Sequence, residues 1–259
     1  MPYTFAHPGF ALPLKKLKTN VFCTTGLIFG SITPDYDIIL RFSNQRLHIF
    51  QYNMRDIFLI ILPIAFVSSI YFHLVIRNVL IDYAPTYLRN SLLKYKDYNY
   101  LNYLKKNSIK VILSIVLAIL LHLFFDLISH LNAYPFKVIG ESYFQSKTVG
   151  FIFYYMAIYL PPILFSIAGF YLIFKIIKET SSLQQLLKLI LEEKKSRYFV
   201  LSFMLITIIV SFVKLAISGI DGQFVIDSFV ISLTNGLIIS FFFTPTIFAI
   251  LKKINNHSG

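Results

Sequence analysis

Long apolar runs, separated by shorter polar and basic segments, dominate this chain. A transmembrane helix needs about 20 predominantly apolar residues. Five runs fit that length: 57–76, 109–131, 149–176, 198–218 and 225–251. The apolar part of the stretch 21–40 is shorter, because Thr24, Thr25 and Gly26 interrupt it and Pro34-Asp35 follows, which indicates a buried half-helix or a re-entrant segment. The pattern predicts an all-α fold: a polytopic transmembrane helical bundle of about five spans plus this N-terminal half-helix or re-entrant segment.

The apolar runs predict a single integral membrane domain over 1–259. Its parts are an N-terminal motif region (1–56), the first two spans (57–131) and three further spans (149–251). Within the last part, the leucines of 180–197 recur at helical spacing behind a Ser181/Gln184 capping box. This segment is therefore expected to form an amphipathic helix on the membrane surface.

Composition and charge agree with a membrane protein. The chain is 56% hydrophobic and 14% charged, whereas soluble domains carry about 25% charged residues. Its net charge of +12 lies in loops between apolar runs, which is typical of positive-inside topology and of attraction to anionic lipid. No basic, aromatic-rich face typical of nucleic-acid binding is evident. We therefore expect membrane lipids as partners, no nucleic acid, and a cytoplasmic C-terminus carrying Lys252 and Lys253.

Three ionisable residues interrupt the second apolar run. His122, Asp126 and His130 are four residues apart, so they share one face of a helix. Ionisable groups inside a membrane cost several kcal/mol unless they are paired, so they usually face a protein interior. Two imidazoles with a carboxylate between them can hold a divalent metal ion. The alternative is an intramembrane hydrogen-bond cluster that fixes helix packing.

Further polar groups precede the first long run. Asp35 and Asp37 follow Pro34 at the end of the half-helix, where they can line a cavity or simply form a turn. His48 lies in the polar connection before the first span. The topology places these groups near the outer end of that span, on the same side as His130.

The remaining intramembrane histidine is expected to lie elsewhere. The first span is expected to run from the outer to the inner surface of the membrane and the second span back to the outer surface. His73 then lies roughly 15 Å or more closer to the inner surface than His122. We interpret His73 as an interfacial histidine at the inner end of a span, which excludes it from a site with Asp126.

Three motifs, in order, resemble a known family. These are His7-Pro8, Gly30-Ser31-x-x-Pro34-Asp35 and His122-x-x-x-Asp126. They lie in the stretches TFAHPGFALPLKKL, IFGSITPDYD, FHLVIRNVLI and HLFFDLISH, which resemble domain-of-unknown-function family 4184, a group of bacterial multi-pass membrane proteins. The resemblance covers the N-terminal half well and the C-terminal half as apolar spans.

The motif order is also similar to a broader set of inner-membrane proteins described as metal-dependent hydrolases. This similarity implies a divalent metal ion, with zinc favoured by imidazole and carboxylate ligands. The implied metal ligands are His7, Asp35, His48, His122 and Asp126. For a hydrolase we expect Asp35 to be a ligand or the general base and Asp37 to orient a ligand. His130, which shares the helix face of His122 and Asp126, is expected to be a ligand or a proton shuttle.

The function expected from these features is hydrolysis of a membrane-associated ester or phosphoester in the bacterial inner membrane. A lipid-linked substrate would reach a site at membrane depth by lateral diffusion. Two alternatives stay open. The first is a transporter or proton pathway, because Pro161 and Pro162 can break a helix as in transport sites. The second is a non-catalytic membrane scaffold that uses the amphipathic helix and the segment 77–110, which is rich in Lys, Arg and Tyr and is expected to form one long loop.

Overall fold

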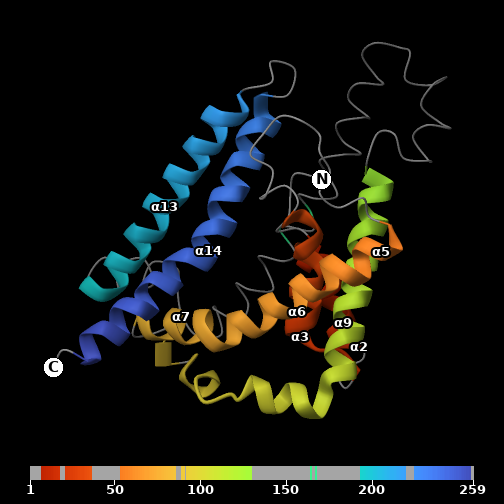
Figure 1. Ribbon diagram of the computed structural model, residues 1–259, viewed down its shortest axis with the longest axis horizontal. Helices are drawn as coiled ribbons and strands as arrows, with labels where there is room; N and C mark the ends of the chain where they lie inside the picture. Colours follow the sequence, from red (N-terminus) through yellow and green to blue (C-terminus); the bar gives the residue numbers. More distant parts are fainter. Residues whose placement is uncertain are drawn as a thin grey trace. The chain divides into compact units, whose positions relative to one another are not determined.

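The computed structural model describes residues 7–17, 21–36, 53–85, 89–90, 92–129, 164, 167, 193–219 and 225–257. Every regular element among these residues is helical, which confirms the all-α prediction (Figure 1). Four helices among them are long and apolar enough to cross a membrane: Met54–Tyr83, Tyr100–Asp126, Lys194–Ser218 and Ser228–Asn256. The predicted span 149–176 lies outside the described residues apart from 164 and 167, and so does all but the end of the predicted surface helix.

The chain forms two compact units. The first unit comprises Met1–Tyr36, Phe50–Phe66 and Ser108–Leu172. The second comprises Asp37–Ile49, Val67–Asn107 and Ile173–Gly259.

Short N-terminal helices build the first unit together with the second half of one long helix. They are α1 (His7–Ala11), α2 (Pro13–Leu17), α3 (Thr24–Ile32) and the 3-10 turn η2 (Thr33–Asp35), and the long helix is α9 (Tyr100–Ser129). Helix α3 is the predicted half-helix. Ala11, Leu27 and Ala118 form a buried core between α1, α3 and α9, with Leu14 and Phe22 packed against it.

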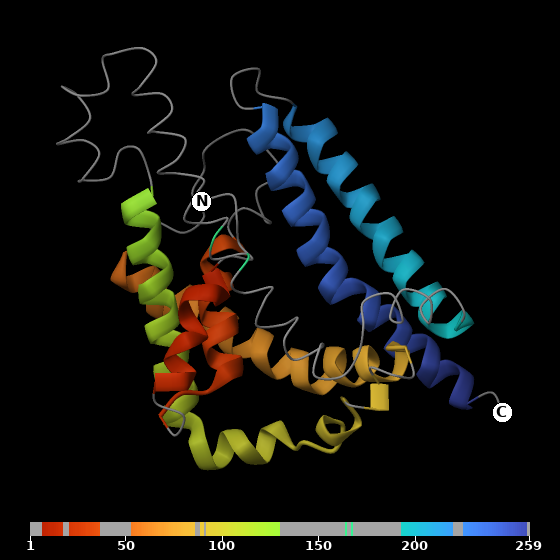
Figure 2. The ribbon, with the colours of Figure 1, turned by 180° about the vertical axis from the view of Figure 1, so that it is seen from behind.

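Two glycines set the close approach of α3 to α9, which lie side by side in Figures 1 and 2. A Cβ atom on Gly30 would be 2.5 Å from the carbonyl oxygen of Ile115 and 2.9 Å from Cβ of Ala118. A Cβ atom on Gly26 would be 2.9 Å from Cβ of Ser114. Small residues four apart allow this kind of helix contact in membranes. The crossing places the C-terminal end of α3 beside the middle of α9.

One side-chain hydrogen bond anchors the beginning of α3 to α9. The first N–H groups of a helix lack partners within it. The N–H of the N-cap residue Cys23 donates to Ser114 Oγ at 2.7 Å, and the Ser114 hydroxyl donates to the Lys110 carbonyl at 2.7 Å. The buried Ser114 thus joins the two helices at the end opposite Asp35.

Replacing Ser114 by Ala should lower the free energy of unfolding by about 1–3 kcal/mol, because it leaves the buried Cys23 N–H without an acceptor. Ser218→Ala is the matched control, because among the described residues the Ser218 hydroxyl donates to the Lys214 carbonyl of its own helix and joins no second helix. Thermal unfolding in detergent measures both changes. A Ser114→Ala effect no larger than that of the control would show that this bond does not anchor α3.

The first long helix is longer than the sequence pattern predicts. It comprises α5 (Met54–Asp56), a π turn η3 (Ile57–Ile61), α6 (Leu62–Tyr71), a second π turn η4 (Phe72–Ile76) and α7 (Arg77–Tyr83). It starts before Ile57 because the Asn53 side chain accepts from the Asp56 N–H at 2.8 Å. It continues past Ile76, so the helix does not end next to His73, where the apolar run ends, and the interfacial position of His73 stays a prediction.

Arg77 explains this continuation. The apolar run ends before this charged residue, but the helix does not, and the guanidinium donates to the carbonyls of Tyr98 at 2.8 Å and Lys96 at 3.2 Å. The segment 77–110, expected as one long loop, also contains the turn η5 (Leu93–Tyr95) and the start of α9. Asn99 begins α9 by accepting from the Asn102 N–H at 2.9 Å.

In the second unit, helices α13 (Lys194–Ser218) and α14 (Val225–His257) pack along their lengths (Figure 1). Polar and small residues line the contact. Thr207 Oγ1 donates to Ser240 Oγ at 2.9 Å, and a Cβ atom on Gly236 would be 2.5 Å from the Thr207 carbonyl oxygen. Helix α14 contains Pro245 without interruption.

Candidate metal centre

Four ionisable side chains meet inside the first unit. His7 is the first residue of α1, Asp35 is the last residue of η2, and His122 and Asp126 lie one turn apart on α9. His7, His122 and Asp35 are 0%, 1% and 3% exposed, and Asp126 is partly buried. The predicted His-x-x-x-Asp face of the second span is therefore the face that α9 turns toward the N-terminal elements.

The ring nitrogens and carboxylate oxygens converge on a small volume. His122 Nε2 lies 3.2 Å from Asp126 Oδ2 and 3.6 Å from Asp35 Oδ1, and His7 Nε2 lies 3.4 Å from Asp35 Oδ2. The imidazole centroids of His7 and His122 are 3.9 Å apart. One ligand atom each from His7, His122 and Asp126 lies within 4.8 Å of the others.

The two separations from Asp35, 3.4 and 3.6 Å, fit ligands of a shared ion better than hydrogen bonds. With bonds of about 2.1 Å, two ligands of a tetrahedral zinc ion lie about 3.4 Å apart. Charge-assisted N–H···O bonds are shorter, at about 2.7–2.9 Å. Within the described part of the chain, His122 Nε2 and both ring nitrogens of His7 have no hydrogen-bond partner. Buried imidazole nitrogens in that state, beside two carboxylates, form a donor set that suits a divalent cation.

A backbone carbonyl fixes the tautomer of His122. Its Nδ1 lies 2.7 Å from the carbonyl oxygen of Ser31. A carbonyl only accepts, so Nδ1 carries a proton, and whenever the ring is neutral its lone pair is on Nε2, which faces Asp35 and Asp126. Pro34 has no N–H to offer the Ser31 carbonyl in the following 3-10 turn. A carbonyl that orients the far nitrogen is the usual support of a histidine metal ligand.

His7 is held in its neutral form. Burial, reinforced by the neighbouring His122 imidazole, holds the pKa of His7 well below its usual range, although Asp126 acts in the opposite direction. At pH 7 an ordinary histidine is still partly protonated, and the lowered pKa removes that charged fraction for His7. A neutral imidazole offers a lone pair to a cation.

Aromatic rings cover one side of the cluster. Phe10, on the same short helix as His7, stacks on Phe125 of α9 with centroids 4.0 Å apart, and its ring meets His7 edge-on at 5.6 Å. The rings replace water on that side and lower the local dielectric constant, which strengthens electrostatic interactions at the cluster.

Not all the predicted residues can be compared with the structure. Asp37, His48 and His130 lie outside the described residues, so their roles stay predictions. His73 belongs to the second unit, where its Nδ1 lies 3.2 Å from Arg77 Nη1 and its ring stacks on Tyr100. The sequence interpretation missed the Ser31 carbonyl and the Phe10–Phe125 wall. Ser31 lies inside a quoted motif, but a backbone acceptor leaves no side-chain signal.

Comparison with known proteins identifies the family. The model of a domain of unknown function, DUF4184, matches residues 1–245. The chain belongs to this family. The match includes all four residues of the DUF4184 cluster described above. No curated protein and no solved structure matches the chain significantly, so the activity of this DUF4184 protein has to be argued from its site.

Proposed function

We propose that this DUF4184 protein is a metal-dependent hydrolase of a membrane-associated phosphoester. The observation that carries the proposal is the convergence of His7, His122, Asp126 and Asp35, whose nitrogens and oxygens lie 3.2–3.6 Å apart across three of the possible pairs. Two of these residues lie on a helix of membrane-spanning length. A purely structural polar cluster would be expected to satisfy its imidazole nitrogens with aligned hydrogen bonds.

His7, His122 and Asp126 would hold the ion, with zinc favoured by the mixed nitrogen and oxygen donors. A bound divalent cation supplies Lewis acidity, which polarises a phosphoryl or acyl oxygen and makes water a stronger acid. Asp35 would serve as a fourth ligand or as the base, since its carboxylate faces both imidazoles.

The chain's own groups would prepare the reaction. Asp35 can accept a proton from an attacking water, and the Ser31 carbonyl holds His122 in one tautomer meanwhile. The Phe10–Phe125 pair excludes bulk water from one side. In this proposal Asp37 orients a ligand and His130 relays protons.

The depth of the cluster favours a lipid-linked or phospholipid substrate. After the kink at Asn107, His122 lies about 21 Å of helical rise beyond Ser108 in a helix that could cross a hydrocarbon core of about 30 Å. Such a site is reached sideways from the lipid phase. In the cell membrane, with the C-terminus in the cytoplasm, the cluster would lie toward the outer half of the bilayer.

Turnover in proteoliposomes tests this proposal. Wild-type protein should release phosphorylated headgroup from a lipid phosphoester, and Asp35→Asn should lower kcat by about 10²–10⁴-fold if Asp35 is the base. Asp82→Asn is the control, because Asp82 is a partly buried carboxylate of the second unit with two lysine partners. Full turnover in Asp35→Asn and Asp126→Asn would contradict the mechanism. Cation uptake without any product would favour the transport alternative.

A further inference from the structure

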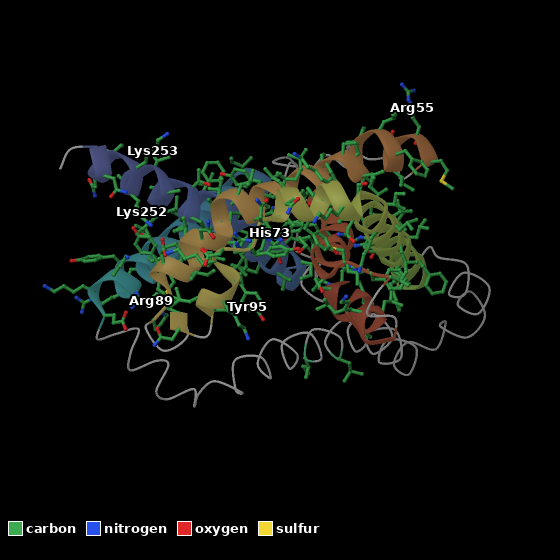
Figure 3. All side chains as sticks on the ribbon, turned by 90° about the horizontal axis from the view of Figure 1, so that it is seen from below. Arg55, His73, Arg89, Tyr95, Lys252 and Lys253 are labelled. Carbon is green, nitrogen blue, oxygen red and sulfur yellow. The ribbon has the colours of Figure 1, made fainter. Side chains whose placement is uncertain are left out.

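The C-terminal ends of α7 and α14 and the N-terminal end of α13, all in the second unit, meet and carry basic side chains. Tyr83 at the end of α7 packs on Phe199 of α13 and on Phe248 of α14. Lys195 Nζ lies 4.8 Å from the Tyr83 ring centroid. Figure 3 shows Lys252, Lys253 and Arg89 at this end of the unit. We call it the basic end, and define it by Arg89, Lys94, Lys96, Lys194, Lys195, Lys252 and Lys253.

One carboxylate fixes two of these cations. Lys96 bonds to one oxygen of Asp82 and Lys252 donates to the other oxygen at 2.5 Å. The two lysines are far apart in sequence, so Asp82 joins the loop after α7 to the end of α14. A single carboxylate neutralises one of the two charges, so the pair keeps a net positive charge. Lys253 and Lys195 beside it are exposed.

Arg77 holds the loop that contributes the apolar part of the surface. Its guanidinium donates to the carbonyls of Tyr98 and Lys96, which fixes the segment 92–98 against α7. That segment exposes Leu93, Tyr95 and Tyr98, which are 43%, 49% and 40% accessible. Lys94 lies over the Tyr95 ring at 5.1 Å. An ordered loop that exposes aliphatic and tyrosine side chains beside lysines matches the membrane interface.

We propose that the basic end binds the headgroup of an anionic phospholipid. Helices α13 and α14 have membrane-spanning length and reach this place at their ends, where headgroups lie. The positive lysines complement the negative charge of the phosphate. The exposed side chains of Leu93 and Tyr95 can contact the apolar boundary between headgroups and acyl chains. A soluble phosphate ion would make no favourable contact with the exposed apolar side chains. The proposal is independent of the metal centre, because all its residues belong to the second unit.

Native mass spectrometry of the full chain in detergent tests the proposal with dioctanoyl phosphatidylglycerol and dioctanoyl phosphatidylcholine as probes. Wild-type protein should prefer the anionic lipid by at least about 100-fold, since each basic residue near the surface contributes about fivefold and three exposed lysines contribute together. The triple variant Lys195→Gln/Lys252→Gln/Lys253→Gln should lose about 100-fold in affinity for phosphatidylglycerol and keep its affinity for phosphatidylcholine.

The control removes the same charge elsewhere: Arg55→Gln/Lys105→Gln/Lys106→Gln changes three exposed cations outside the basic end. It should keep the preference, and so should the charge-preserving variant Lys195→Arg/Lys252→Arg/Lys253→Arg. Equal losses in the control, or no preference in wild type, would overturn the proposal. Displacement of the lipid by millimolar inorganic phosphate would also overturn it, by identifying a free-anion site. Unchanged thermal unfolding of all variants shows that folding does not cause the loss.

Discussion

Protein in which Gln replaces His122 should purify without a divalent metal ion, whereas the wild type should carry about one ion per chain. His122 contacts both carboxylates through Nε2, and the Ser31 carbonyl orients that nitrogen. Gln is close to His in size and is polar, so folding is expected to be largely preserved. Its amide is a far weaker metal ligand than imidazole. Mass spectrometry of metals in detergent-purified protein, prepared without chelator, measures the effect.

His73→Gln is the matched control for this prediction. His73 is also a buried histidine on a helix of membrane-spanning length, but it bonds to Arg77 and stacks on Tyr100 in the second unit. Replacement of His73 should leave the metal content unchanged. Asp126→Asn, like His122→Gln, should lower the metal content. Metal retained in His122→Gln, or absent from folded wild-type protein, would leave the cluster as helix packing and remove the basis of the hydrolase proposal.

Gly30→Ala should both destabilise the first unit and weaken metal binding. The added methyl group would lie 2.5 Å from the Ile115 carbonyl oxygen, which belongs to backbone and cannot rotate away. Overpacking of this kind costs about 1–3 kcal/mol. The helices must separate, which moves Ser31 and Asp35 away from His122. Loss of such supporting groups typically lowers metal affinity by about 10–100-fold.

Gly236→Ala separates the two effects. Its methyl group would be equally close to the Thr207 carbonyl oxygen, at the crossing of α13 and α14 in the second unit. Thermal unfolding should show a comparable loss of stability for both variants, while metal titration should show weaker binding in Gly30→Ala alone. Equal metal affinities in the two variants would show that the α3–α9 crossing does not position the site.

Local pattern was enough to predict much of the fold and part of the site. The period of apolar residues predicts the long helices, and the four-residue spacing places His122 and Asp126 on one face of α9. The ends of the helices were not predicted correctly, because they depend on single polar side chains. Asn53 and Asn99 begin two helices earlier than the apolar runs do, and Arg77 allows one to continue.

The meeting of the motifs could not be worked out from local pattern. His7, Asp35 and His122 approach each other because Gly26 and Gly30 let α3 contact the backbone of α9. That contact joins residues about 90 positions apart, as does the bond from His122 to Ser31. The resemblance to a family associated these residues by their order in the chain, and the glycine crossing supplies the physical reason for their association.

The π turn around His73 means that the contacts made by the end of the first long helix depend on its exact number of residues. A π turn accommodates an extra residue, and one residue corresponds to about 100° of rotation in an α-helix. A chain lacking one residue between Phe72 and Ile76 could form a regular α-helix there with all its hydrogen bonds. The same deletion would rotate Arg77 away from the Lys96 and Tyr98 carbonyls and Asp82 away from its two lysines. A one-residue deletion here would therefore be tolerated by the helix itself and would dismantle the contacts of the basic end.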